Sequence, residues 1–174
     1  MRVKKFNQSN YKIMFKYIIS VALLLVGFNS LAMPKVGEMA PDIQMDEFSL
    51  KDAKGKIVVL YFYPRDNTSN CTTEAKAFAE YHAELEKLGA VVVGVSSGSQ
   101  QMHRQFKETN NLPFALISDE QKTIIKQYDV SGFIWSQRAT FLIDREGKIA
   151  YIWRSVNVNT HAQEVIKKIE ELKL

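Results

Sequence analysis

The sequence has 174 residues, of which 46% are hydrophobic and 24% are charged, and its formal net charge is +4. Five of the 23 Lys and Arg residues, but none of the 19 Asp and Glu residues, lie in the first 32 positions. The rest of the chain is therefore close to neutral, which argues against nucleic-acid binding through a broad basic surface. Residues 33–174 are numerous enough for one domain with its own hydrophobic core.

Residues 1–32 have the pattern of a secretory signal peptide. Basic residues precede an uncharged apolar run over residues 17–28, and Ser30-Leu31-Ala32 offers small side chains at the cleavage positions. The run is shorter than the roughly 20 residues that span a bilayer. We expect cleavage after Ala32, export to the bacterial periplasm and no stable membrane association afterwards. The alternative is an uncleaved anchor, because residues 13–15 could lengthen the apolar run.

Cys71 is the single cysteine of the chain. Exported proteins usually carry cysteines in pairs, so a lone one is an inert core residue, an intermolecular cross-link or a reactive thiol. The inert reading is the commonest, because free cysteine packs like a small hydrophobic residue. However, Cys71 follows the apolar run 57–63 and opens an amphipathic segment. At the start of a helix, unpaired N–H groups and the helix dipole favour the reactive thiolate.

The hydrophobic pattern of residues 33–130 predicts alternating strands and helices after an extended arm and a hairpin near residues 46–55. We expect strands at 57–63, 90–95 and 114–117, a helix from Cys71 to Leu88, a helix at 99–110 with Met102 and Phe106 inward, and a helix capped by Asp119. Strands that alternate with helices pair in parallel through right-handed crossovers. The sequence therefore predicts an α/β fold in one domain.

The last part of the chain changes character after Gly132. Residues 139–143 and 149–153, joined by a polar turn, predict an antiparallel hairpin. A final helix is predicted from a capping box of Thr160 and Gln163 and from an apolar stripe. The residues of this stripe are Ala162, Val165, Ile166, Ile169 and Leu172.

Two motifs around Cys71 resemble a known family. Pro64, Thr68 and Cys71 form the pattern Pro-x-x-x-Thr-x-x-Cys, and residues 138–144 read Arg-Ala-Thr-Phe-Leu-Ile-Asp. With Tyr63, Asp66 and His103 in matching places, the chain resembles the peroxiredoxins of the AhpC/TSA superfamily, in the bacterioferritin comigratory protein (PrxQ-like) branch. The resemblance implies a thioredoxin-like fold, with a central mixed β-sheet flanked by helices and an N-terminal β-hairpin.

The resemblance also implies roles for individual residues. Cys71 would be the peroxidatic nucleophile that becomes a sulfenic acid. Arg138 would stabilise its thiolate more than an exposed helix dipole does. Thr68 would hold the peroxide oxygen, Pro64 would shape the pocket and keep water away, and Glu74 would orient Arg138. Taken singly, Thr68 could be only a helix cap, Pro64 a strand stop and Glu74 a favourable charge at a helix start.

The sequence departs from many relatives at two places. Ser69-Asn70 stands where they have Pro-Gly, and Lys76 stands where they have a second, resolving cysteine. We therefore expect a one-cysteine cycle that reduces hydrogen peroxide and organic hydroperoxides. An external thiol, either a thioredoxin-like protein or a small thiol, would reduce the sulfenic acid. We expect no cofactor or metal, and a monomer or weak dimer.

Other functions need different residues. His82, His103 and His161 lack ligand spacing, and we interpret them as surface or core-edge residues. A Cys-His hydrolase or transferase built from Cys71 with His103 or His161 would leave Thr68 and Arg138 unexplained. The remaining alternative is an exported thioredoxin-fold thiol protein or binding module without peroxidase activity. Trp135 could line the pocket mouth or a partner surface, or have no such role.

Overall fold

The computed structural model describes residues 33–174, so the predicted signal peptide lies outside the described residues. A five-stranded mixed sheet forms the centre of the described part, in the order β5-β4-β3-β6-β7. Its strands are β3 (Ile57–Phe62), β4 (Ala90–Ser96), β5 (Ala115–Ser118), β6 (Ala139–Ile143) and β7 (Ile149–Trp153). β3 pairs in parallel with β4, and β4 with β5, as the alternating pattern predicts. β6 is antiparallel to both β3 and β7, which confirms the C-terminal hairpin and makes the sheet mixed.

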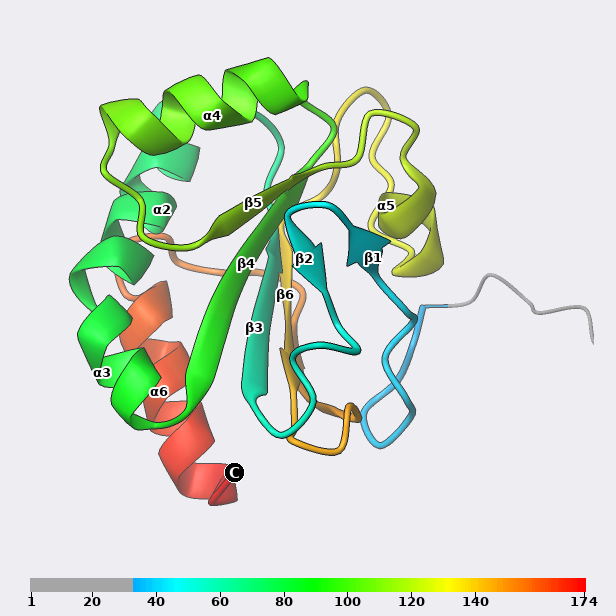
Figure 1. The fold of residues 1–174 in the computed structure, drawn as a ribbon, viewed down its shortest axis with the longest axis vertical. Coiled ribbons are helices and arrows are strands. Elements are labelled where there is room, and N and C mark those ends of the chain that lie inside the picture. Colours follow the sequence, from blue (N-terminus) through cyan, green and yellow to red (C-terminus); the bar gives the residue numbers. More distant parts are fainter. Residues whose placement is uncertain (1–32) are drawn as a thin grey trace, which may run out of the picture. The chain divides into compact units, whose positions relative to one another are not determined.

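Helices cover both faces of this sheet (Figure 1). They are α2 (Ser69–Glu80), α3 (His82–Lys87), α4 (Gln100–Thr109), α5 (Thr123–Gln127) and α6 (His161–Leu172). Every residue of β3 is buried, and its side chains alternate between two cores. Tyr61 packs against Phe78 of α2 in a core that also contains Val165 of α6. Phe62 belongs to the core on the other face, together with Ile125 of α5. The alternation explains why β3 reads as a continuous apolar run.

A small antiparallel hairpin precedes the central sheet, as predicted. It consists of β1 (Gln44–Met45) and β2 (Phe48–Ser49). Its turn is at residues 46–47, so the turn-like residues 52–55 lie after the hairpin and do not form it. Asp119 serves α5 as expected, because its two carboxylate oxygens accept hydrogen bonds from the backbone N–H groups of Thr123 and Ile125. Both distances are 2.8 Å.

The predicted helix from Cys71 to Leu88 is wrong in one respect, because it breaks at Tyr81 into α2 and α3. Tyr81 leaves helical geometry, with φ −90° and ψ 8°. The break directs Leu85 of α3 into the core. It also lets the Tyr81 hydroxyl accept a hydrogen bond from Gln163 of α6. These tertiary contacts override the helical pattern of the segment.

The inward face of α4 also differs from the prediction. His103 and Phe106 are buried, whereas Met102 is 38% exposed. The buried stripe is rotated by one residue because His103, a polar residue, has buried hydrogen-bonding partners. Ser99 caps the helix by accepting a hydrogen bond from the Met102 backbone N–H.

The predicted capping box of α6 is not formed. Thr160 occupies the N-cap position, but its hydroxyl donates to the Glu164 side chain at 2.5 Å and makes no cap hydrogen bond. Gln163 is engaged with Tyr81 instead. The apolar stripe is buried at four of its five positions, and Leu172 near the C-terminus is 42% exposed.

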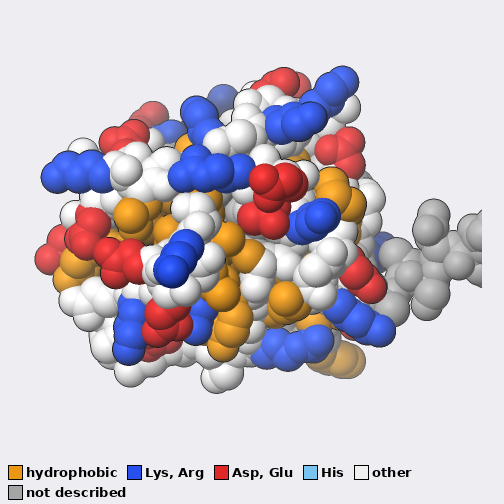
Figure 2. Space-filling view, turned by 90° about the horizontal axis from the view of Figure 1, so that it is seen from below, with side chains coloured by type: hydrophobic (Ala, Val, Ile, Leu, Met, Phe, Trp, Pro, Cys, Tyr) orange, Lys and Arg blue, Asp and Glu red, His pale blue; other side chains and the backbone are white. Residues whose placement is uncertain are grey.

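The surface and the helices give two further findings. No described helix is long and apolar enough to cross a membrane. On the face seen in Figure 2, basic and acidic side chains are interspersed around a band of apolar ones. This mixture agrees with the nearly neutral composition of the part after residue 32, because neither sign of charge dominates that face.

Candidate active site

Cys71 lies in the first turn of α2, the helix that follows β3 after a short loop. It is in phase with Ala75 and Phe78, and all three belong to one buried core cluster. The Cys71 residue is only 2% exposed and is not in a disulfide. The thiol is therefore held at the inner side of the helix start, next to the end of the sheet.

Arg138 reaches Cys71 from a neighbouring strand. It directly precedes β6, whose Ala139 pairs with Phe62 at the end of β3, and this register brings Arg138 to the start of α2. Its Nη2 atom lies 3.1 Å from Cys71 Sγ, while Nη1 donates to Glu74 Oε2. One planar guanidinium thus binds the sulfur and a carboxylate together, which the separated N–H groups of arginine permit.

Glu74 is buried one helical turn from Cys71, with 1% exposure. Burial raises the pKa of Glu74 to about 7, although the charge and the hydrogen bond of Arg138 favour ionisation. The pKa of Arg138 is raised as well, because the attraction of Glu74 and the contacts with Cys71 outweigh its burial. The second oxygen of Glu74, Oε1, has no hydrogen-bond partner. The structure thus joins Cys71, Arg138 and Glu74 in one cluster, which is the arrangement that the family resemblance implied.

Thr68 and Pro64 lie in the loop that joins β3 to α2. Thr68 occupies the N-cap position of α2, but its side chain makes no capping hydrogen bond, so the plain helix-cap explanation fails. Its Oγ1 donates instead to the Arg65 carbonyl oxygen at 3.1 Å, and the residue is exposed. Asn67, in the left-handed region at φ 58°, turns the chain between them. The Thr68 hydroxyl is therefore exposed at the start of the helix that carries Cys71, and it has to turn from the Arg65 carbonyl oxygen before it can donate to another group.

The two departures from the familiar motif are accommodated locally. Ser69 and Asn70 are simply the first residues of α2, so the turn does not need Pro-Gly. Lys76 is exposed on α2, away from the buried face that carries Cys71. Because the whole sequence contains one cysteine, the chain cannot form an intramolecular disulfide.

The interpretation of the histidines as surface or core-edge residues is wrong for two of the three. His103 is 2% exposed and His161 is completely buried. His161 Nε2 lies 2.8 Å from Thr140 Oγ1, and its ring meets the rings of Phe78 and Trp153 edge to face. Burial, with a smaller effect of Arg138, lowers the pKa of His161 to about 4.

No histidine binds the sulfur within residues 33–174. The one side chain there that hydrogen-bonds to Cys71 Sγ is Arg138. His82 is instead in contact with Glu86 on α3, at 3.5 Å. The geometry therefore lacks the nucleophile–base contact that a Cys-His hydrolase requires. The same part of the chain contains no group of three or more His, Cys, Asp or Glu that could hold a metal ion.

Sequence reasoning did not foresee a buried contact between Asp66 in the active-site loop and His103 in α4, at 2.7 Å. The two are 37 positions apart, and no spacing rule joins them. The available signal for this contact was that both residues belong to the family pattern. Trp135 is 42% exposed, and the Arg65 guanidinium lies 5.2 Å above its ring, so this tryptophan lies beside the active-site loop.

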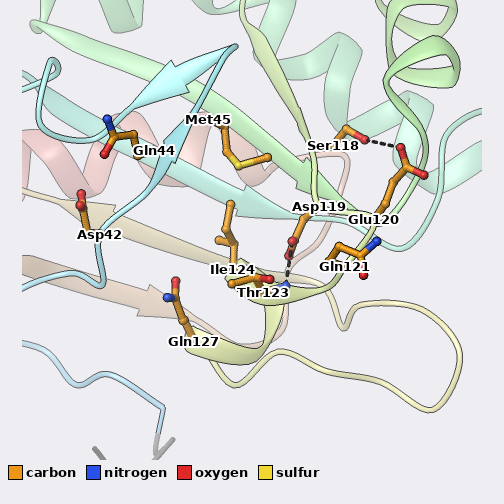
Figure 3. A pocket seen from close by; sticks show the side chains of 10 residues that line it. All are labelled: Asp42, Gln44, Met45, Ser118, Asp119, Glu120, Gln121, Thr123, Ile124 and Gln127. Atoms are coloured by element: carbon orange, nitrogen blue, oxygen red, sulfur yellow. Dashed lines mark hydrogen bonds between the residues drawn. The ribbon is translucent and has the colours of Figure 1, made fainter.

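A pocket of about 710 Å³ lies elsewhere, between the β1–β2 hairpin and α5 (Figure 3). Its lining includes Asp42, Met45, Asp119 and Gln127, but none of the residues around Cys71. The Asp119 carboxylate is occupied by the backbone of α5. The pocket is therefore separate from the thiol cluster.

The mixed sheet, the thiol at a helix start and the arginine beside it define a thioredoxin-like thiol peroxidase. The family model that matches the chain, over residues 36–152, is described as the AhpC/TSA family. The chain belongs to this family, and within it to the Bcp/PrxQ branch of the peroxiredoxins.

The relatives support this assignment over most of the chain. Peroxiredoxin Bcp of Bacillus subtilis (strain 168) is 38% identical over 151 residues, which cover 79% of this chain and 96% of that protein. A putative peroxiredoxin bcp of Coxiella burnetii is 42% identical and covers 78% of this chain and 98% of its own. The crystal structure of a mutant of Xylella fastidiosa PrxQ has a TM-score of 0.75 and 29% identity. It covers 82% of this chain and 99% of its own. The thioredoxin-like fold predicted from the sequence is confirmed.

Proposed function

We propose that the protein reduces hydrogen peroxide and organic hydroperoxides through Cys71 and that an external thiol completes its cycle. The observation that carries the proposal is the double contact of Arg138 with Cys71 Sγ and Glu74. A fixed cation at 3.1 Å stabilises a thiolate and also lies where negative charge develops during the reaction.

In the first half of the cycle, the Cys71 thiolate attacks one peroxide oxygen. A sulfur–oxygen bond forms, the O–O bond breaks, and the departing oxygen takes up a proton to leave as water or an alcohol. Arg138 donates hydrogen bonds to the peroxide oxygens, and the Thr68 hydroxyl turns from the Arg65 carbonyl oxygen to donate one as well. Pro64 has no N–H group and limits the access of water. Glu74 holds Arg138 in place.

In the second half, an external thiolate attacks the sulfur of the Cys71 sulfenic acid. The sulfenic oxygen leaves as water, and a mixed disulfide forms. A second external thiol then attacks the disulfide and releases Cys71 as the thiolate, with the donor oxidised. The single cysteine supports this route, because no second sulfur in the chain can do the same work.

The range of peroxides is supported by a relative. One solved structure concerns the alkyl peroxide reduction activity of the Xanthomonas campestris bacterioferritin comigratory protein. That protein is 32% identical over 71% of this chain, with a TM-score of 0.68. We extend this substrate class to the present protein as part of the proposal.

The decisive experiment mixes purified protein with one equivalent of peroxide and follows its consumption by stopped flow. The wild type should consume the peroxide and yield a sulfenic acid that dimedone traps at Cys71. Cys71→Ser, which keeps the size and loses the thiolate, should consume none. A wild type that leaves stoichiometric peroxide unreacted would refute the peroxidase and favour a thiol protein without this activity. A screen of thioredoxin-like proteins and small thiols then identifies the donor.

We also propose export to the periplasm after cleavage at Ala32 and a monomer or weak dimer as the mature state. The pattern of residues 1–32 supports the first part. Expression of the full chain in a bacterium, followed by fractionation and N-terminal sequencing, should give a periplasmic protein that begins at Met33. A full-length protein in the membrane fraction would identify an uncleaved anchor instead. Sedimentation over a range of concentrations tests the oligomeric state.

A further inference from the structure

A buried polar cluster lies next to the active-site loop and has no part in the cycle described above. It consists of Tyr63, Asp66, Ser96 and His103, each at most 4% exposed. His103 Nδ1 lies 2.7 Å from Asp66 Oδ2, and the Tyr63 hydroxyl donates to Asp66 Oδ1 at 2.8 Å. The Asp66 carboxylate therefore has both of its oxygens bound by side chains.

The other edge of the imidazole is also held. His103 Nε2 lies 3.3 Å from Ser96 Oγ and 3.2 Å from the Ile117 carbonyl oxygen. A Cβ atom added at Gly98 would lie 2.8 Å from His103 Cε1 and 3.2 Å from Asp66 Oδ2, so the cluster is tightly enclosed. His103 is thus fixed between α4 and the ends of β4 and β5, and it presents Nδ1 to the loop.

Asp66 is the point at which this rigid frame reaches the active site. It lies between Pro64 and Thr68, directly before the left-handed Asn67. The same loop is tied from the other side, because Ser136 Oγ donates to the Tyr63 carbonyl oxygen at 2.7 Å. Ser136 is two residues before Arg138. The loop that carries Thr68 and the segment that carries Arg138 are therefore anchored to each other and to His103.

Stability alone does not explain a buried polar pair at this place. A buried carboxylate carries a desolvation penalty that its partner offsets only with good geometry, and apolar residues of similar size often serve stability as well. Buried polar groups can instead specify one conformation. The place of Asp66, in the loop between two proposed site residues, favours this second use.

We propose that His103 is a positioning residue for peroxide reduction. Through its hydrogen bond to Asp66, it holds the loop of residues 64–68 so that Pro64 and Thr68 keep their places relative to Cys71. The inference rests on the proposed peroxidase function and adds a residue that does not touch the peroxide or the sulfur.

Two amide substitutions test the hydrogen bonds of the two imidazole nitrogens separately. The amide nitrogen of His103→Asn falls near the position of Nδ1 and can still donate to Asp66. His103→Gln reaches the position of Nε2, so it keeps the contacts with Ser96 and Ile117 but loses Asp66. We expect His103→Gln to lower the second-order rate constant for peroxide by roughly 10- to 100-fold, as small displacements of reacting groups do. His103→Asn should stay within about threefold of the wild type, since the donor is restored.

Two further readouts distinguish positioning from a general structural role. Alkylation of Cys71 by iodoacetamide does not need Thr68 or the peroxide geometry, so its rate in His103→Gln should stay within a few-fold of the wild type. In a double-mutant cycle with Asp66→Ala, which removes both carboxylate oxygens, the double variant should be no slower than the slower single variant, because both changes break one link. His82→Gln, a substitution of a histidine remote from the cluster, is the control and should leave the peroxide rate unchanged.

The outcomes are distinguishable from those that test the function itself. A wild type inert toward peroxide would refute the peroxidase. With an active wild type, three results would overturn the role of His103: a wild-type rate in folded His103→Gln, equal losses in the Asn and Gln variants, or additive effects with Asp66→Ala. If His103→Gln does not fold, Asp66→Ala alone tests the same link, and a wild-type peroxide rate in that variant would refute it.

Discussion

The contacts of Arg138 show what an arginine beside the thiol can do that a lysine cannot. Its two terminal nitrogens bind different partners, Cys71 Sγ and Glu74 Oε2. A lysine carries one ammonium on a flexible stem and cannot present this planar fork. The contact therefore depends on shape as well as on charge.

Arg138→Lys should accordingly slow the peroxide reaction by about 10- to 100-fold, and Arg138→Ala should slow it more, since a tenfold change corresponds to about 1.4 kcal/mol of barrier. Both rates are measured in single turnover with stopped flow. Arg145→Lys, at an exposed arginine on the turn before β7, is the matched control. A rate in Arg138→Ala equal to that of the wild type would remove the arginine from the mechanism.

Thr68 gives a second test at this scale, because its hydroxyl does not cap α2. Thr68→Val keeps the shape and removes the hydroxyl, so it should slow peroxide reduction by about 100-fold, the usual effect of losing a donor to developing charge. Its free energy of unfolding should change by less than about 1 kcal/mol, since the residue is exposed. Thr68→Ser should retain most of the activity. Equal rates for Val and wild type would show that the hydroxyl is not used.

Two buried titratable groups near Arg138 oppose each other in their effect on stability. The pKa of Glu74 is raised from 4.5 to about 7 by burial, so its contribution to stability is full below about pH 4.5 and is lost as the pH rises through 7. The pKa of His161 is lowered from 6.5 to about 4, so its contribution is full above about pH 6.5 and is lost as the pH falls through 4.

Single substitutions should reveal these opposite dependences of the free energy of unfolding on pH. A change of one pKa unit corresponds to about 1.4 kcal/mol, so each group changes the free energy of unfolding by about 3 kcal/mol across its window. Relative to the wild type, Glu74→Gln should lose stability as the pH falls from 7 to 4.5. His161→Gln should gain stability as the pH falls from 6.5 to 4. Urea unfolding at several pH values measures both. Parallel curves for the wild type and a variant would contradict the assignment of that group.

At the scale of elements, local sequence rules worked where one strong signal decided the structure. The buried run of β3, the Pro-containing loop after it and the turn before β7 lie where the pattern put them. The rules failed where a contact with a residue far away in the sequence determined the local structure. Tyr81 breaks a helix to meet α6, and His103 replaces Met102 on the inner face of α4 because Asp66 is there to bind it.

The same reasoning applies to the site. Cys71, Arg138 and Glu74 were predicted together because the family pattern carries their association across 67 residues. Periodicity alone could not have brought Arg138 to the start of α2, since that contact depends on the register between β3 and β6. The Asp66–His103 contact was missed because a polar residue on an amphipathic helix ordinarily indicates the solvent face.

The Asp119 carboxylate offers a test of one element. It accepts hydrogen bonds from two backbone N–H groups at the start of α5, a helix of only five residues. Asp119→Ala should therefore lower the free energy of unfolding by about 1 to 2 kcal/mol, as the loss of a helix cap does. Chemical denaturation measures the change, and Asp52→Ala, at an exposed aspartate outside the left-handed backbone region, is the control. A loss no greater than that of the control would show that α5 does not need the cap.

At the scale of the whole molecule, the five-stranded sheet works as a frame that brings distant segments to one end of β3. Cys71 follows β3, Arg138 precedes β6, and the neighbouring ends of β4 and β5 hold His103. Each segment alone is ordinary in sequence. The chemistry that we propose arises from the register in which the sheet assembles them.

In the one-cysteine cycle that we propose, the single buried sulfur would also set the lifetime of the protein during oxidative stress. A sulfenic acid that meets a second peroxide before a thiol becomes a sulfinic acid, with loss of water or alcohol, and this step is irreversible for most proteins. Without a partner sulfur in the chain, only the outside thiol competes with this loss. The number of turnovers before inactivation should therefore increase in proportion to the thiol-to-peroxide ratio. Mass spectrometry of Cys71 during steady turnover follows the formation of the sulfinic acid and so measures this number of turnovers. A number of turnovers that does not depend on the thiol-to-peroxide ratio would contradict the one-cysteine cycle. The fraction of protein with irreversibly oxidised Cys71 would then report how much external thiol was present, because the protein is inactivated when that thiol is scarce.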